Sequence, residues 1–270
     1  MKKDSWPGLR AVTLFVVMVN VLYNYVVERF AFSGASIQIV SDRYHNAFSP
    51  APYAFAIWGV IYTAFIAYGI AQLLPAHRAR LKLDAVSGML LVINGLAIVW
   101  VSLFRQEQLA LSLMIIVGML TAGIAMYVCA QEAIECGESR WWRLPSSLFL
   151  GWISVATIAN VSAFLVAHRI HGGFVGEAPW AISMMLLATI FGVAMAVRYR
   201  DFVVPLVIAW GTMAIGVESG HAAGGIAVGA YLLASVAALA GFTVIGLEVA
   251  RRYPSRVAAR PATTARTRAA

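Results

Sequence analysis

The chain has 270 residues, of which 61% are hydrophobic and only 12% are charged. Because roughly 25% of the residues in a soluble domain are charged, this composition excludes a soluble globular protein and indicates a polytopic membrane protein. The net charge of +8 requires no nucleic-acid partner, because the basic residues follow the membrane topology described below.

The apolar residues are grouped into eight runs of membrane-spanning length. A spanning helix needs about 20 largely apolar residues, and the connections between these runs are too short to hold a separate soluble domain. The predicted spans cover residues 8–31, 51–74, 83–104, 108–134, 143–167, 179–198, 201–219 and 222–250. We therefore expect an all-α fold, a polytopic transmembrane bundle of about eight helices.

The basic residues predict the orientation of the bundle. Lys and Arg accumulate in short cytoplasmic loops, and with the N-terminus inside, 16 of the 20 basic residues fall in cytoplasmic segments. The exceptions are Arg29, Arg43, Arg105 and Arg169. We expect a multi-pass protein of the bacterial inner membrane with both termini in the cytoplasm. Its basic tail, residues 251–270, is expected to be disordered and attracted to anionic lipid.

Residues 32–50 form the longest connection, which this orientation places on the outer side. The connection leads into Pro50 and Pro52, and proline is tolerated in the first turn of a helix, so we expect a helix to begin there. The span that follows carries an aromatic ladder formed by Tyr53, Phe55, Trp58, Tyr62, Phe65 and Tyr68.

Several aromatic and polar side chains lie deep in the spans and at a similar level. With a rise of 1.5 Å per residue, Trp58 lies roughly 10 Å below the outer start of its span. The first, third and fifth spans add Asn20, Tyr23, Asn24, Asn94, Trp100, Trp152, Thr157 and Asn160. In contrast, Trp6, Trp141, Trp142 and Trp180 lie at span ends and are expected to be interfacial anchors.

This convergence predicts an outer-half cavity. Aromatic walls with a few hydrogen-bonding groups suit a flat, mostly apolar ligand. A single intramembrane asparagine can equally form a hydrogen bond between helices. That alternative stays open for Asn20, Asn24, Asn94 and Asn160.

Ion coupling, catalysis and metal binding have no signature in the sequence. No Asp, Glu, Lys or Arg lies in the middle third of a predicted span, where pumps usually place one. Nucleophile elbows, phosphate loops and paired carboxylates are missing. Cys129 and Cys136 have no histidine nearby. His168 and His171 lie together and His221 follows Glu218, but no third ligand converges by sequence. We expect neither an enzyme nor a resident cofactor or metal ion.

The last span contains a series of small residues separated by four or eight positions, namely Gly225, Gly229, Ala237 and Gly241. Such a series lets another helix approach closely. We favour packing inside the chain over a homodimer interface, which stays the alternative.

The fifth span carries the sequence W-x-S-x-A-T-x-x-N at residues 152–160. This pattern resembles the fifth helix of the TspO/MBR family, the translocator proteins or tryptophan-rich sensory proteins. The resemblance continues in the second span at Pro50, Pro52, Tyr53, Phe55, Trp58 and Tyr62, and in the third at Asn94. The chain departs from the family pattern at Leu90, Ala97 and Leu148, where the family has glutamine, often tryptophan, and proline.

The resemblance implies a five-helix core in residues 1–167, followed by three additional transmembrane helices in residues 168–250, as in the longer bacterial branch. It also implies a cavity beneath the first connecting loop that binds porphyrins, sterols or synthetic aromatic ligands, lined by Trp58, Tyr62, Asn94, Trp152 and Asn160. The depth argument adds Trp100, Tyr23, Asn24 and Thr157 to the expected ligand-binding residues.

We expect a sensory or binding protein for a hydrophobic aromatic ligand, such as a tetrapyrrole or a sterol-like molecule. The alternative is a small-molecule transporter or exporter that uses the same cavity, and an enzyme acting on a bound tetrapyrrole is a third hypothesis. The expected partners are the lipid bilayer, the hydrophobic ligand and, if the last span forms an interface, a second copy of the chain.

Overall fold

The computed structural model describes residues 7–30, 34–77, 80, 82–170, 176–221 and 225–252. These residues contain α-helices, short 3-10 helices and connections, and they contain no strand. The α-helices are α1 (Pro7–Phe30), α2 (Ile37–Arg43), α3 (Ile57–Ala71), α4 (Lys82–Arg105), α5 (Leu109–Glu135), α6 (Leu144–Ala167), α7 (Glu177–Tyr199), α8 (Val203–Glu218) and α9 (Ile226–Arg252). The predicted all-α membrane bundle is therefore confirmed.

Eight of these helices lie at the positions of the eight predicted spans, and α2 is the additional one. Seven are long and apolar enough to cross a membrane, with α3 counted together with the 3-10 turn Pro52–Ala56 that precedes it. The exception is α8, which has 16 residues and is therefore roughly 24 Å long. The predicted tail and Trp6 fall largely outside the described residues.

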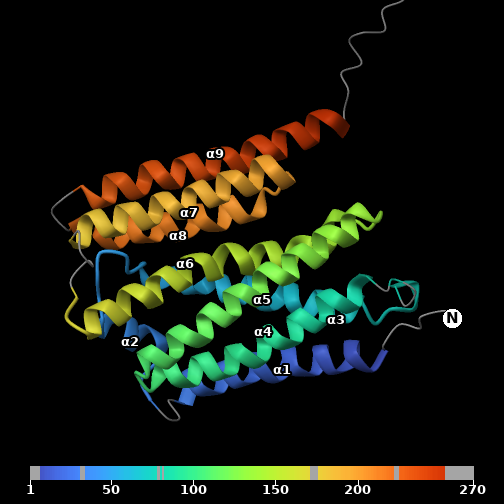
Figure 1. Ribbon diagram of the computed structural model, residues 1–270, viewed down its shortest axis with the longest axis horizontal. Helices are drawn as coiled ribbons and strands as arrows, with labels where there is room; N and C mark the ends of the chain where they lie inside the picture. The colour runs from blue at the N-terminus through green and yellow to red at the C-terminus, as the bar shows by residue number, and fades with distance from the viewer. Residues whose placement is uncertain are drawn as a thin grey trace, which may run out of the picture.

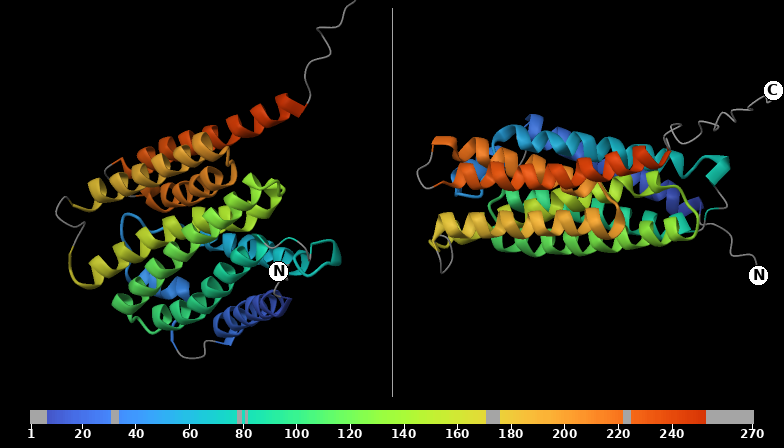
Figure 2. Two further views of the ribbon diagram at one scale, coloured as in Figure 1. Left: turned by 45° about the vertical axis from the view of Figure 1, so that its right-hand side comes forward. Right: turned by 90° about the horizontal axis from the view of Figure 1, so that it is seen from above.

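The helices form a ring of five and a group of three (Figure 1). The ring runs α1, α3, α6, α5, α4 and back to α1, each helix packing on the next. The other three, α7, α8 and α9, pack on one another, and α8 attaches the group to α6 (Figure 2). Because the long helices alternate in direction, one end of the bundle gathers the loops predicted to lie on the outer side and the other gathers the segments predicted to be cytoplasmic.

Glycines allow α8 to approach its neighbours closely. A Cβ on Gly151 of α6 would lie 2.9 Å from Val207, and one on Gly241 of α9 would lie 2.8 Å from Leu206. Both contacts are shorter than side chains tolerate, so these positions require glycine for the observed packing. In α9, Ala237 is fully buried, so this part of the small-residue series packs inside the chain.

The short helix α2 lies in the connection of residues 32–50, where no helix was predicted. Its N-cap is Ser36, whose hydroxyl accepts a hydrogen bond from the backbone N–H of Ile39 at 3.1 Å. Val40 is completely buried against the bundle. The cap and the apolar residues at spacings of three and four, Ile37, Val40 and Tyr44, are typical of a surface helix.

Candidate functional site

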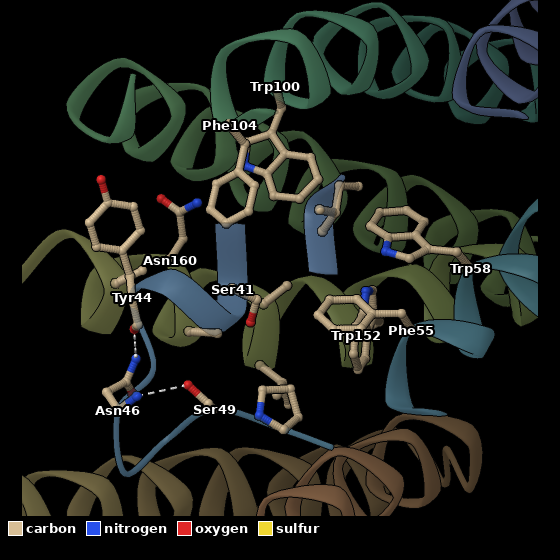
Figure 3. A pocket seen from close by; sticks show the side chains of 16 residues that line it. Ser41, Tyr44, Asn46, Ser49, Phe55, Trp58, Trp100, Phe104, Trp152 and Asn160 are labelled. Carbon is tan, nitrogen blue, oxygen red and sulfur yellow. Dashed lines mark hydrogen bonds between the residues drawn. The ribbon is translucent and has the colours of Figure 1, made fainter. Parts of the chain in front are cut away.

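The first cavity lies beneath α2, between α3, α4 and α6 (Figure 3). It is small, about 50 Å³. Its walls are formed by Ile37, Ser41, Tyr44, Asn46, Ser49, Pro50, Phe55, Trp58, Trp100, Phe104, Trp152, Val155, Ala156, Ala159, Asn160 and Ala163. Aromatic rings and small aliphatic groups dominate this lining, and the few polar groups come from α2, the loop after it and α6.

A second, larger cavity of about 460 Å³ adjoins the first and lies between α1, α3 and α4. The two cavities share Ile37, Phe55, Trp58 and Trp100 as a common wall. The larger one also has Tyr25 in its lining, and 64% of that side chain is exposed. The larger cavity therefore reaches the surface of the bundle between α1 and α3, and its volume falls in the range of small-molecule sites.

The aromatic walls are arranged edge to face around Trp152. The ring of Trp58 lies 6.5 Å from that of Trp152 at an angle of 84°, and Phe55 lies 6.2 Å away at 81°. On the opposite wall, Trp100 stacks on Phe104 with centroids 5.2 Å apart. Edge-to-face pairs fix ring orientation, so these side chains form a defined surface rather than a loose apolar lining.

Two buried hydrogen-bond donors in this lining have no partner. The indole N–H groups of Trp100 and Trp152 are buried, with side-chain exposures of 6% and 2%, and neither meets an acceptor among the described residues. Figure 3 shows the nitrogen of Trp152 on the edge of its ring that is turned toward Trp58. Buried donors are nearly always paired in folded proteins, so both groups are suited to an acceptor atom of a bound molecule.

Asn160 adds a third weakly satisfied polar group. Among the described residues, the one hydrogen-bond partner of its amide is the hydroxyl of Ser112 in α5, at 3.4 Å from both the amide oxygen and the amide nitrogen. That separation is long for a hydrogen bond. Since Asn160 is buried and lines the cavity, its amide remains able to bind a ligand.

The segment that covers the cavity, here called the cover, comprises α2 and the residues after it as far as Ala54. One of its attachments is to the turn after α4. The hydroxyl of Tyr44 donates to the carboxylate of Glu107 at 2.8 Å, and Arg43 pairs with the same carboxylate. The hydrogen bond to Glu107, together with burial, raises the pKa of the Tyr44 hydroxyl above its ordinary value. Within the cover itself, the side chain of Asn46 donates to the carbonyl of Tyr44 at 3.0 Å.

The same covering segment is also attached to α8. The backbone N–H of Ala51 donates to the carbonyl of Ala214 at 3.0 Å, and the indole of Trp210 donates to the carbonyl of Ala54 at 3.1 Å. Tyr53 packs edge-on against Trp210 at 5.1 Å. The start of the helical segment that carries Phe55 and Trp58 is therefore held by α8.

The structure brings together many of the residues expected at the site. Trp58, Trp100, Trp152 and Asn160 line the inner cavity, while Tyr62 and Asn24 line the larger one.

Three expected residues line neither cavity. The Oδ1 of Asn94 accepts a hydrogen bond from Asn20 at 2.9 Å, which is the interhelical bond considered as the alternative. Tyr23 bonds to Ser102 at 2.6 Å, and Thr157 donates to the carbonyl of Ile153 in its own helix at 2.7 Å. These side chains serve packing within the helices and between them.

Sequence reasoning missed Phe104, Tyr44 and Ser41 as lining residues. Phe104 could have been found, because it follows Trp100 by four residues and therefore lies on the same helix face. Tyr44 and Ser41 depend on α2, which was not predicted. Among the described residues, no three histidine, cysteine or acidic side chains lie together as metal ligands would.

Comparison with known proteins gives one match. The sequence model of the TSPO-like protein family matches residues 10–244, from the first turn of α1 into α9. No curated protein and no solved structure gives a match. Because the matched region covers most of the chain and includes all of the long helices at least in part, this protein is a member of the TSPO-like family.

Proposed function

We propose that this membrane protein binds a flat, largely apolar ligand of the tetrapyrrole or sterol class in the two adjoining cavities, and that it acts as a sensor. The observation that carries the proposal is the pair of buried indole N–H groups of Trp100 and Trp152, which have no partner among the described residues and lie in a mainly apolar, aromatic lining. A purely structural aromatic cluster gains nothing from unpaired donors, because each costs the loss of its hydrogen bond to water.

In this proposal the ligand enters between α1 and α3, where the larger cavity reaches the surface at Tyr25. Its flat apolar part lies against Trp58 and Tyr62. An acceptor group of the ligand, such as a carboxylate or carbonyl oxygen, takes the N–H of Trp152 or Trp100. The amide of Asn160 supplies a further donor or acceptor.

The inner cavity is small, so binding requires the cover to shift. With about 50 Å³ beneath α2 and about 460 Å³ beside it, a large ligand lies mainly in the outer space and inserts only its polar edge. Movement of α2 upon binding is the structural change that a sensor could transmit.

The test uses protoporphyrin IX and the purified full-length chain, with binding followed through the Soret absorbance of the ligand. Trp152→Phe keeps an aromatic ring and removes the N–H, and we expect roughly five- to tenfold weaker binding, as for the loss of one hydrogen bond. Trp142→Phe is the matched control, since Trp142 packs against Tyr68 and His77 at the other end of the bundle. Equal affinity of the two variants would refute the site.

Transport is the second candidate, favoured by the opening of the larger cavity between α1 and α3. The described helices place no charged side chain in their middle third, so we expect no coupling to protons. Liposomes that contain the protein should show no ligand accumulation under an imposed pH gradient. Gradient-driven uptake that is lost in Asn160→Ala would favour the transporter, and consumption of the bound tetrapyrrole in product analysis would favour an enzyme.

The bacterial inner membrane and the orientation with both termini in the cytoplasm belong to the same proposal. Reporter fusions after Arg256 and in the loop at residues 78–82 should indicate the cytoplasm, and a reporter at His45 should indicate the opposite side. A fusion after Arg256 that reports the outer side would mean that α8 does not cross the membrane.

A further inference from the structure

A groove of about 490 Å³ runs along the outside of the bundle between α7 and α9, far from the ligand cavity. Its length is apolar and includes Val197, Val236, Ala240 and Val244. It ends in charged side chains at the end of the bundle that the basic residues assign to the cytoplasm. The apolar part of the groove therefore lies along the membrane-spanning helices, and its charged part lies at the predicted cytoplasmic end.

A separate cavity of about 200 Å³ continues from the charged end of this groove. The two spaces share Arg200 and Glu248, and the second is also lined by Arg140 and Trp141. Trp141 is 67% exposed, as expected of an aromatic side chain at the membrane interface.

The charges at this junction do not balance. Arg140 donates to Glu248 at 2.7 Å, and Arg143 pairs with buried Asp201. Arg200 and Arg251 have no carboxylate partner in the part of the chain that the structure describes. Two positive charges therefore face the end of an apolar groove.

The backbone of Arg200 also marks this position. Its φ is +50° and it ends α7 in the left-handed conformation, where glycine or asparagine is usual. A residue that keeps a strained conformation while carrying a long charged side chain suggests a role for that side chain.

We propose that the groove and the cavity beside it bind one anionic phospholipid. The phosphate lies against the guanidinium groups of Arg200 and Arg251, and an acyl chain runs along the groove between α7 and α9. Basic pockets between helices at the cytoplasmic face favour anionic headgroups in this way. A second copy of the chain is a poorer occupant, because a two-fold interface through this groove would bring the same arginines together.

The test is native mass spectrometry of the full-length chain in a neutral detergent, titrated with dioleoyl-phosphatidylglycerol or with dioleoyl-phosphatidylcholine, which has the same acyl chains. We expect preferential retention of one phosphatidylglycerol. Each arginine removed should weaken that retention roughly fivefold, so Arg200→Gln combined with Arg251→Gln should lower it roughly 25-fold.

The matched control is Arg198→Gln, which removes a charge two residues from Arg200. Arg198 lines neither space, and its guanidinium lies over Tyr199. A third variant, Ala240→Phe, fills the groove and should reduce phosphatidylglycerol binding without loss of charge. Equal retention of both lipids, or an equal loss in Arg198→Gln, overturns the proposal. Binding of glycerol 3-phosphate alone that Ala240→Phe leaves unchanged, or a dimer that this variant dissociates, also overturns it.

Discussion

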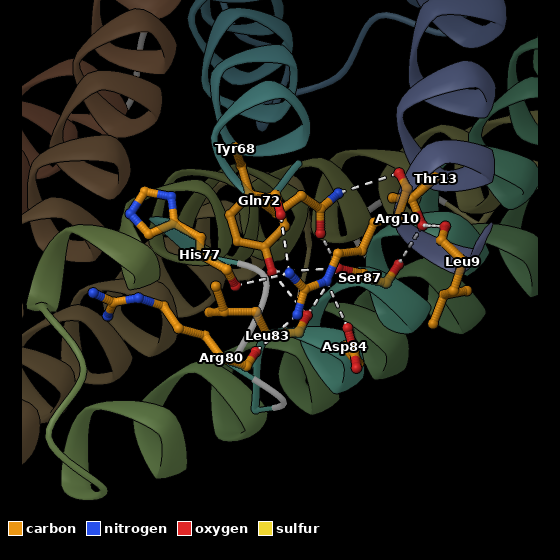
Figure 4. Close-up of polar contacts among 10 residues, drawn as sticks. All are labelled: Leu9, Arg10, Thr13, Tyr68, Gln72, His77, Arg80, Leu83, Asp84 and Ser87. Atoms are coloured by element: carbon orange, nitrogen blue, oxygen red, sulfur yellow. Dashed lines mark hydrogen bonds and ion pairs between the residues drawn. The ribbon is translucent and has the colours of Figure 1, made fainter. Parts of the chain in front are cut away.

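Two sets of buried donors in the five-helix ring differ in whether they have partners. At the end that holds the start of α1, the guanidinium of Arg10 donates to Asp84 at 2.7 Å and to the carbonyls of Gln72, His77 and Arg80 at 2.9 Å each (Figure 4). In the lining of the cavity, the indole donors of Trp100 and Trp152 meet no acceptor among the described residues.

The difference separates structure from binding. A buried charge with its donors paired fixes the chain around it, because no alternative partner is as favourable. Arg10 thus anchors α1 to the connection between α3 and α4. Donors without partners gain from any acceptor that reaches them, which is the property expected of a binding site.

The largest effect is expected when the anchored end is broken. Arg10→Ala removes the guanidinium that donates to Asp84 and to three backbone carbonyls, and removing one partner of a buried ion pair costs about 3 to 5 kcal/mol. The free energy of unfolding in detergent should fall by that amount. Arg29→Ala is the control, because Arg29 is exposed. A loss below about 1 kcal/mol would show that the anchor is not essential.

The unpartnered donors should behave in the opposite way. Trp100→Phe removes an N–H that has no partner, so the cost is limited to lost packing, about 1 to 2 kcal/mol. Ligand affinity should nevertheless fall roughly fivefold. Combining unfolding measurements with protoporphyrin titrations separates the two quantities. A large loss of stability with unchanged affinity would mean that the two sets of donors do not differ as described.

A smaller effect is expected at the connection between α8 and the cavity. Trp210→Phe removes the hydrogen bond to Ala54, so stability should fall by about 1 kcal/mol and ligand affinity should fall severalfold as Phe55 and Trp58 shift. Trp180→Phe removes one comparable bond, to Ser162 at 3.1 Å, in a region that lines neither ligand cavity. If both variants lower affinity equally, the connection to α8 has no special role.

The smallest effect is expected at the cover itself. Glu107→Gln weakens the partly exposed pair with Arg43, which contributes at most about 1 kcal/mol. Hydrogen exchange of α2 should become severalfold faster while global unfolding stays unchanged. Because the pKa of Tyr44 is raised, its hydrogen bond to Glu107 persists below pH 10 and is lost only as the pH rises through this higher pKa. If hydrogen exchange of α2 at neutral pH were already as fast in the wild-type chain as in Glu107→Gln, this prediction would be contradicted.

Much of this architecture could be predicted from the sequence, because an apolar run of spanning length has few alternatives to a helix in a membrane. Depth could also be read, since it follows from residue number. Rotation about the helix axis could not, and Asn94 illustrates the difference. It lies at the expected level but faces Asn20 rather than the cavity. The contacts of Trp210 with Ala54, 156 residues apart in sequence, likewise depend on tertiary packing that has no local signature.

The bonds from Ala51 and Ala54 to α8 have a consequence for any attempt to reduce this protein to its smallest working part. A shortened chain ending at residue 167 would retain all five helices of the ring and every side chain that lines the two adjoining cavities beneath and beside α2. It would lack the acceptor for Ala51 and the donor for Ala54, and it would expose Gly151 and Val155 of α6 to lipid. Helix α8 is therefore part of the frame of the cavity, and because α7 and α9 pack on α8, binding studies require the whole membrane region.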